Sequence, residues 1–159
     1  MVKFDFDFDL GADKDVAVSS TVIQEYANWL PLLDNNDKDD VMVGQLLLVA
    51  IGNTALKMQD SFGPLLLISL KPVLEKAGNN RFSSAAVTTL QAMANSQHCS
   101  TISHLLEANS DYFAPQLSFQ LRNIFRYPHA IDLLRALLIF SDVRMDHWLE
   151  HIVHQALKG

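Results

Sequence analysis

The chain has 159 residues, of which 49% are hydrophobic and 19% are charged, and its formal net charge is -6. A chain of this length and hydrophobicity can bury one sizeable core, which excludes disorder over its whole length. The negative charge and the lack of a Lys/Arg cluster with interleaved aromatics leave nucleic-acid binding without an electrostatic basis, because phosphate backbones repel such a chain.

The N-terminal segment differs from the rest in charge and pattern. Residues 1–40 hold ten acidic and three basic side chains, and MVKFDFDFDL alternates apolar and acidic residues. A signal peptide needs an unbroken apolar run, so secretion is not expected. We predict an acidic flexible tail over residues 1–18, with a docking peptide as the alternative, and a helical-repeat domain over residues 19–159.

Helical periodicity begins at Ser19 or Ser20, either of which can cap a helix that runs to Leu33. The acidic segment 34–40 lacks the glycine and the terminal glutamate of a calcium-binding EF-hand loop, and we interpret it as a solvated turn. Asp39 or Asp40 is then expected to cap a long helix up to about Gln59.

The middle of the chain predicts two further helices. One starts between residues 61 and 64, is expected to bend at Pro72, and is stopped by Gly78 and the two asparagines behind it. The next opens at Ser83 or Ser84 and ends near residue 97. The apolar runs in this region are far shorter than the roughly 20 residues of a membrane span, so no membrane association is expected.

A short helix over residues 101–108 leads into the C-terminal third. The N–H groups in the first turn of a helix have no partner within the helix, so proline is tolerated there. In a helix that starts at residue 109, Pro115 would lie beyond this turn, so we expect the helix to be regular only from about Ala114. Pro128 fits the first position of the next helix, and Asp142 can cap the last one, up to about Lys158.

These patterns predict an all-α fold of seven or eight helices. The expected helix pairs begin near residues 19, 61, 100 and 128, which gives units of the size found in HEAT and armadillo repeats. Each pair has more apolar surface than it can bury alone, which favours an α-solenoid of HEAT/armadillo-like antiparallel pairs. A compact bundle of the same helices is the alternative architecture.

The sequence His147-Trp148-Leu149-Glu150-His151 matches the H-x-x-E-H pattern of inverted zinc proteases. On a helical wheel the three histidines and Lys158 lie opposite an apolar face, so we expect them to face solvent. That apolar face comprises Leu149, Ile152, Val153, Ala156 and Leu157. The only cysteine, Cys99, follows His98, and neighbours in sequence do not face each other as a thiolate and its base must. We therefore predict no catalytic residue, no metal site and no cofactor.

Charged residues among the most apolar helices are candidates for pairing or recognition. Asp132 and Arg135 can pair along one helix. Arg122 can reach a carboxylate or exposed helix carbonyls on the neighbouring helix, across the turn before Pro128. Aromatic residues are frequent anchors of interfaces, although most aromatics at helical spacing belong to the core. The candidates for protein interaction or repeat packing are Asp111, Tyr112, Arg122, Tyr127, His129 and Trp148.

Part of the C-terminal half resembles the TEL-two-interacting protein one family. The resemblance lies in Asn109-Ser110-Asp111-Tyr112, then Leu117-Ser118, Leu121-Arg122, Pro128-His129-Ala130 and Ser141-Asp142, and covers residues 102–142. It implies a fragment of the HEAT-repeat scaffold of the Triple-T cochaperone complex, without catalytic residues. The family's members are longer chains, so an isolated segment is expected to expose apolar surface or to self-associate.

The resemblance also implies partners and a compartment. The implied partners are the other Triple-T subunits, the phosphatidylinositol-3-kinase-related kinases that they help to mature, and the heat-shock chaperone machinery. Signalling by the target of rapamycin and the DNA damage response would be the affected processes, in the cytoplasm and also in the nucleus. The alternatives are a free-standing helical adaptor, with polar outer faces on its end helices, and a zinc-dependent hydrolase using His147, Glu150 and His151.

Overall fold

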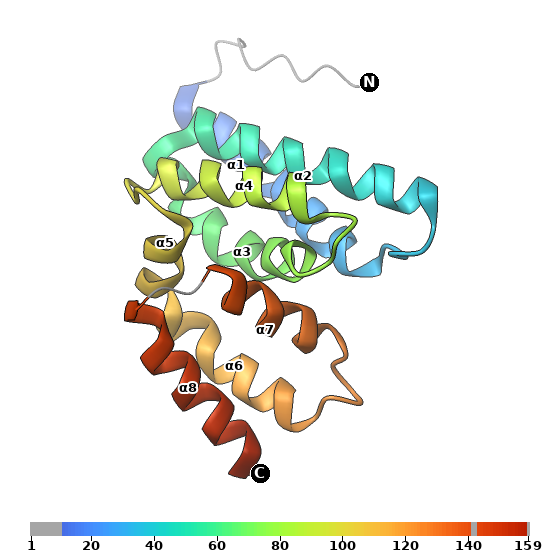
Figure 1. The fold of residues 1–159 in the computed structure, drawn as a ribbon. Coiled ribbons are helices and arrows are strands. Elements are labelled where there is room, and N and C mark those ends of the chain that lie inside the picture. Colours follow the sequence, from blue (N-terminus) through green and yellow to red (C-terminus); the bar gives the residue numbers. More distant parts are fainter. Residues whose placement is uncertain (1–10, 141–142, 159) are drawn as a thin grey trace.

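The computed structural model describes residues 11–140 and 143–158 as helices joined by short turns (Figure 1). These residues form eight α-helices and no strand, which confirms the predicted all-α class and helix number. The elements are α1 (Gly11–Trp29), η1 (Leu30–Leu32), α2 (Lys38–Met58), η2 (Gln59–Phe62), α3 (Gly63–Ala77), α4 (Ser83–Ser96), α5 (Ile102–Ala108), α6 (Ser110–Arg122), α7 (His129–Phe140) and α8 (Val143–Lys158).

The first four helices form two stacked pairs. Helix α3 packs against α1, and α4 packs against α2, so that each helix contacts the equivalent helix of the neighbouring pair (Figure 1). This is the HEAT-like arrangement that the helix pairing predicted, because each pair buries its apolar face against the next. The order changes after α4: α7 packs on α3, while α6 lies against α7 and α8.

Two glycines let α2 and α4 approach closely. A side chain at Gly44 would overlap the ring of the fully buried Phe82, and a Cβ atom at Gly52 would lie 3.3 Å from the Cα atom of Thr89. The Thr89 hydroxyl, also buried, donates a hydrogen bond of 2.6 Å to the carbonyl oxygen of Leu48. Small residues and a bond to helix backbone thus fix the distance between the pairs.

Two helix starts differ from the prediction. Helix α1 begins at Gly11, and Ser19 is buried inside it, so neither Ser19 nor Ser20 is the cap. Helix α2 is capped by Asp37, whose carboxylate accepts hydrogen bonds from the backbone N–H groups of Asp39 and Asp40. Residues 1–10 lie outside the described part, and the division into a tail and a repeat domain stays a prediction.

The expected start of α6 near Ala114 is wrong, because α6 begins at Ser110 and contains Pro115. Proline removes the hydrogen bond to the carbonyl four residues earlier, which belongs to Asp111. Both residues are exposed, so water can bond that carbonyl and the helix continues. The predicted stop of α3 at Gly78 is confirmed, whereas the predicted cap Asp142 lies outside the described residues.

Helix α7 packs closely against the end of α3 at Gly78. A side chain at this position would overlap the backbone carbonyl of Asp132, so the two backbones are in direct contact. Arg135 donates a hydrogen bond of 3.1 Å to the Gly78 carbonyl and lies 3.2 Å from the Asp132 carboxylate. The predicted pairing of Asp132 with Arg135 is confirmed. The carbonyl contact expected of Arg122 is made by Arg135, since Arg122 is exposed and has no polar partner among the described residues.

Lys76 is a buried charge between the first and second pairs. Its side chain is only 4% exposed, its Nζ donates a hydrogen bond of 2.9 Å to Asn35, and it lies 4.4 Å from the centre of the Phe82 ring. The lysine therefore connects the turn before α2 with the turn before α4 through one hydrogen bond and one cation–π contact.

One stretch, Lys38–Ala77, is long and apolar enough by composition to cross a membrane, with a mean hydropathy of 1.5. In the fold it is three elements, α2, η2 and α3, and Gln59 between them has a positive φ of 52°. Helices α2 and α3 both pack against α4, and 33% of the apolar window is buried in the fold.

Candidate protein-interaction site

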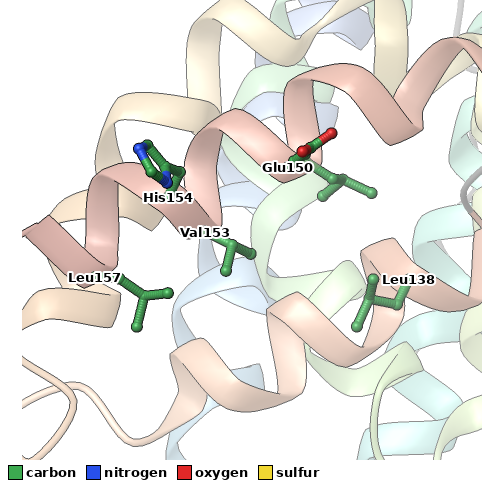
Figure 2. Close-up of a pocket in the computed structure, with 6 residues that line it drawn as sticks. Leu138, Glu150, Val153, His154 and Leu157 are labelled. Atoms are coloured by element: carbon green, nitrogen blue, oxygen red, sulfur yellow. The ribbon is translucent and has the colours of Figure 1, made fainter.

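An apolar groove lies between α7 and α8. It has a volume of about 440 Å³, and Figure 2 shows Leu138 of α7 across from Val153 and Leu157 of α8. Leu138 is 57% exposed and Leu157 is 81% exposed, which is unusual for leucines on two neighbouring helices. Among the residues that the structure describes, the lining is Leu138, Leu149, Glu150, Val153, His154 and Leu157.

The groove is open because α7 and α8 each pack against a different helix and not closely against each other. Helix α7 buries Ala130, Leu133 and Leu137 and packs against α3, whereas α8 packs against α6. The apolar face predicted for α8 is only partly covered: Leu149 and Ile152 are 3% exposed, but Leu157 is open. The last turn of this face is therefore open to solvent at Leu157.

The polar side of α8 faces solvent, as its helical wheel predicts. His147, Glu150, His151 and His154 are all exposed and line a separate surface pocket of about 520 Å³. Among the described residues, no group of three or more His, Cys, Asp or Glu side chains is placed to hold a metal ion. The zinc-hydrolase hypothesis thus has no ligand set in this part of the chain.

Cys99 is not paired with its neighbour His98. Burial raises the pKa of the Cys99 thiol, which disfavours the reactive thiolate. His98 adopts a left-handed φ of 61°, and its Nε2 lies 2.6 Å from Oδ1 of Asp60. The two side chains therefore engage different partners, and this geometry is that of a packed cysteine.

The interaction residues proposed from sequence fall into two groups. Asp111 and Tyr112 are exposed in the first turn of α6, whereas Arg122 and His129 are exposed near its other end, about 17 Å away at 1.5 Å per residue. Tyr127 is half-buried and packs on Phe119, with ring centres 5.8 Å apart. The side chain of Trp148 lies outside the described part. The role of these residues in binding stays a prediction.

The groove residues were not predicted as a site. Leu149, Val153 and Leu157 belong to the predicted apolar face of α8, and Leu138 is one of several leucines of α7. Nothing in a single sequence separates a leucine that is covered from one that stays open, because both satisfy the same helical period. The sequence does show that α7 carries apolar residues on more than one side, which indicates that it needs more than one neighbour.

Glu75 supplies an electrostatic test of the contact region between α3 and α7. Burial raises the pKa of its carboxyl group above the ordinary value, and the charges of Lys71, 3.3 Å away, and of His129 oppose that shift. A raised pKa means that the folded state holds the proton more tightly than the unfolded state. The corresponding stabilisation is complete below about pH 4.5 and is lost as the pH rises through the folded-state pKa.

We expect Glu75→Gln to remove this dependence. The free energy of unfolding of the original chain, relative to Glu75→Gln, should decrease as the pH is raised from 4 to 7. Urea denaturation at a series of pH values measures the difference. Glu25→Gln, at an exposed position of α1, serves as the control. A difference that stays constant over this range, or increases with pH, would contradict the assigned burial.

The stacked helix pairs define a HEAT-like helical-repeat protein with an open apolar groove between its last two helices. The family model described as TELO2-interacting protein 1 matches residues 70–157, and the chain belongs to this family. The match includes the stretch 102–142 that carried the resemblance and extends from the end of α3 to the groove.

The TELO2-interacting protein 1 homologs of Mus musculus and Homo sapiens are each 31% identical to the chain over 112 residues. These alignments cover 69% of this chain but 10% of either relative, so the chain spans about a tenth of the length of these curated relatives. No solved structure matches the chain.

Proposed function

We propose that the chain is a non-catalytic, protein-binding segment of an α-solenoid, and that the groove between α7 and α8 is its binding site. The main support for this proposal is that the family match covers both walls of an open apolar groove. A groove of this shape suits the apolar face of an amphipathic helix, which would cover Leu138 and Leu157. A basic residue on that helix would face the exposed Glu150 at the groove's edge.

The proposed occupant is a helix of a TELO2-type protein. The curated relatives are named for interaction with TELO2, and membership of their family supports the same partner here. In this proposal the chain takes part in the Triple-T complex, which with the heat-shock chaperone matures phosphatidylinositol-3-kinase-related kinases. Its place of action would be the cytoplasm and also the nucleus.

A free-standing adaptor is less well supported. That alternative requires polar outer faces on the end helices, but Leu138, Ile139 and Leu157 are between 57% and 81% exposed at one end of the fold. Open apolar helix faces are instead expected where a stack of repeats makes further contacts. This observation favours a segment that is covered by other protein surfaces.

Purified chain and purified TELO2 should form a complex that depends on the groove. Leu138→Asp is expected to weaken binding by roughly a hundredfold, because it places a charge at the centre of an apolar contact. Isothermal titration calorimetry measures the affinity. Leu46→Asp on the distant helix α2 is the matched control, since Leu46 is 64% exposed and outside the groove.

Equal affinity of Leu138→Asp and the original chain would overturn the groove as the site. The absence of any complex with the original chain would overturn the proposed partner. Circular dichroism of each variant establishes that helix content is unchanged, which separates lost binding from lost folding.

A further inference from the structure

A second apolar surface lies on the long helix α2, remote from the groove. Five large hydrophobic side chains on this helix are between 41% and 64% exposed, although α2 also contributes to the core. They are Met42, Val43, Leu46, Val49 and Leu56. We refer to these five residues as the α2 stripe.

The α2 stripe lies on the side of the helix opposite α4. Gly44, Leu48 and Ile51 are buried, and α2 packs against α4 in the stacked layer. At 100° per residue, Leu46 and Val49 project on the other side of the helix from these three. Figure 1 shows α2 at the edge of the stack with α4 beneath it. The layer formed by α2 and α4 can therefore be extended by one more helix.

Charges of opposite sign flank the α2 stripe. Asp39 is in the first turn of α2, and Lys57, which also makes a contact within its own chain, is exposed in its last turn. They are 18 residues apart, which is five helical turns, so both lie on the same line along the helix as the α2 stripe. The face is therefore acidic at one end, apolar in the middle and basic at the other end.

Such a face is complementary to an antiparallel copy of itself. Two α2 helices related by a two-fold axis place Asp39 of each copy beside Lys57 of the other, and the helix dipoles also run in opposite directions. The two stripes then cover each other. Asn53 is the polar position within this face, and it limits the stability of the contact without preventing it.

We propose that the occupant of the α2 stripe is a second copy of this chain, and that the chain forms a two-fold dimer through antiparallel packing of α2. This interface extends the α2 and α4 layers of both copies into one continuous layer of four helices. It is independent of the proposed function, because the groove between α7 and α8 stays open in each copy.

Sedimentation equilibrium of the 159-residue chain over a range of concentrations tests the dimer. Leu46→Asp is expected to raise the dimer dissociation constant by about a hundredfold, because each dimer contains the buried charge twice. Leu138→Asp, which changes the groove, is the control and should leave the dimer unchanged. The two variants thus have opposite effects on self-association and on binding of TELO2.

A charge exchange tests the antiparallel geometry. Asp39→Lys and Lys57→Glu should each weaken self-association by about tenfold, because each places like charges together at both ends of the interface. An equal mixture of the two variants should form a mixed dimer, in which both pairs again have opposite charges. Mass photometry or native mass spectrometry with one copy enlarged by a tag distinguishes mixed from single-species dimers.

A chain that stays monomeric at all concentrations overturns the proposal, and it points to another protein as the occupant of the α2 stripe. A dimer that Leu46→Asp does not weaken overturns it as well. A dimer that Leu46→Asp weakens but the charge mixture does not restore overturns the antiparallel arrangement. Circular dichroism and thermal unfolding establish that each variant is folded.

Discussion

Gly78→Ala is expected to destabilise the chain by about 3 kcal/mol or more, an effect at the upper end of those caused by inserting one methyl group into a packed site. The added Cβ atom would overlap the Asp132 carbonyl oxygen. The position of a Cβ atom is fixed by its backbone and the Asp132 oxygen is itself a backbone atom, so no side-chain rotation can relieve the contact. Helix α7 must move away from α3, which also breaks the bond from Arg135 to the Gly78 carbonyl.

Gly63→Ala is the matched control for this change. Gly63 begins α3, and a Cβ atom there meets only the side chain of Gln97 at an ordinary distance of 3.5 Å. Alanine favours helix over glycine by up to about 1 kcal/mol, so Gly63→Ala should be neutral or slightly stabilising. Urea denaturation of both variants gives the comparison. Similar stabilities for the two alanine variants would show that α7 is not held against Gly78.

Lys76→Glu is expected to cost about 3–5 kcal/mol, the range found when a buried charge loses its partner. Burial already lowers the pKa of Lys76, and the negative charges of Glu75, Asp132 and Asp40 oppose that shift. A carboxylate at this position is repelled by the same three groups. It also loses the hydrogen bond to Asn35 and the favourable contact with the Phe82 ring.

Lys76→Met separates the charge from the packing of the side chain. Methionine keeps an unbranched stem of similar length beside Phe82 and removes a charge that is costly to bury, so the expected loss is only about 1 kcal/mol. Thermal unfolding followed by circular dichroism measures both variants. Equal destabilisation by Glu and Met would show that the volume at residue 76, and not its charge, determines the effect.

Most of the helical order was available from the sequence. The helical spacing of apolar residues and the positions of glycine and proline predicted the helix count, the stop of α3 at Gly78 and the turn before α7, because these depend on local residue types. Caps were less predictable where several candidates lie together: Asp37, Asp39 and Asp40 are all suitable, and the structure uses Asp37. The prediction at Pro115 rests on the loss of a helix hydrogen bond, whereas in the exposed turn of α6 water can replace that bond.

The contacts between helices that are distant in the sequence could not be predicted from local residue types. Gly78 looks like a helix stop, and its contact with Asp132 depends on the position of α7. Lys76 looks like a solvated base in the last turn of a helix, yet it is buried between two turns. The apolar residues of α2 and α8 showed that these helices are amphipathic, but coverage of each face is decided by its neighbours. The groove and the α2 stripe both belong to this second kind of information.

The contact between α3 and α7 has a consequence for how the chain acquires its structure. It joins residues 57 positions apart, from Gly78 to Arg135, whereas the first two pairs are assembled from closer neighbours. During synthesis α3 is therefore complete well before α7 leaves the ribosome, and its binding surface for α7 is exposed in the interval. Until α7 arrives, the end of α3 at Gly78 lacks its contacts with Asp132 and Arg135. Formation of the Gly78 junction is thus the step that covers this surface in the growing polypeptide.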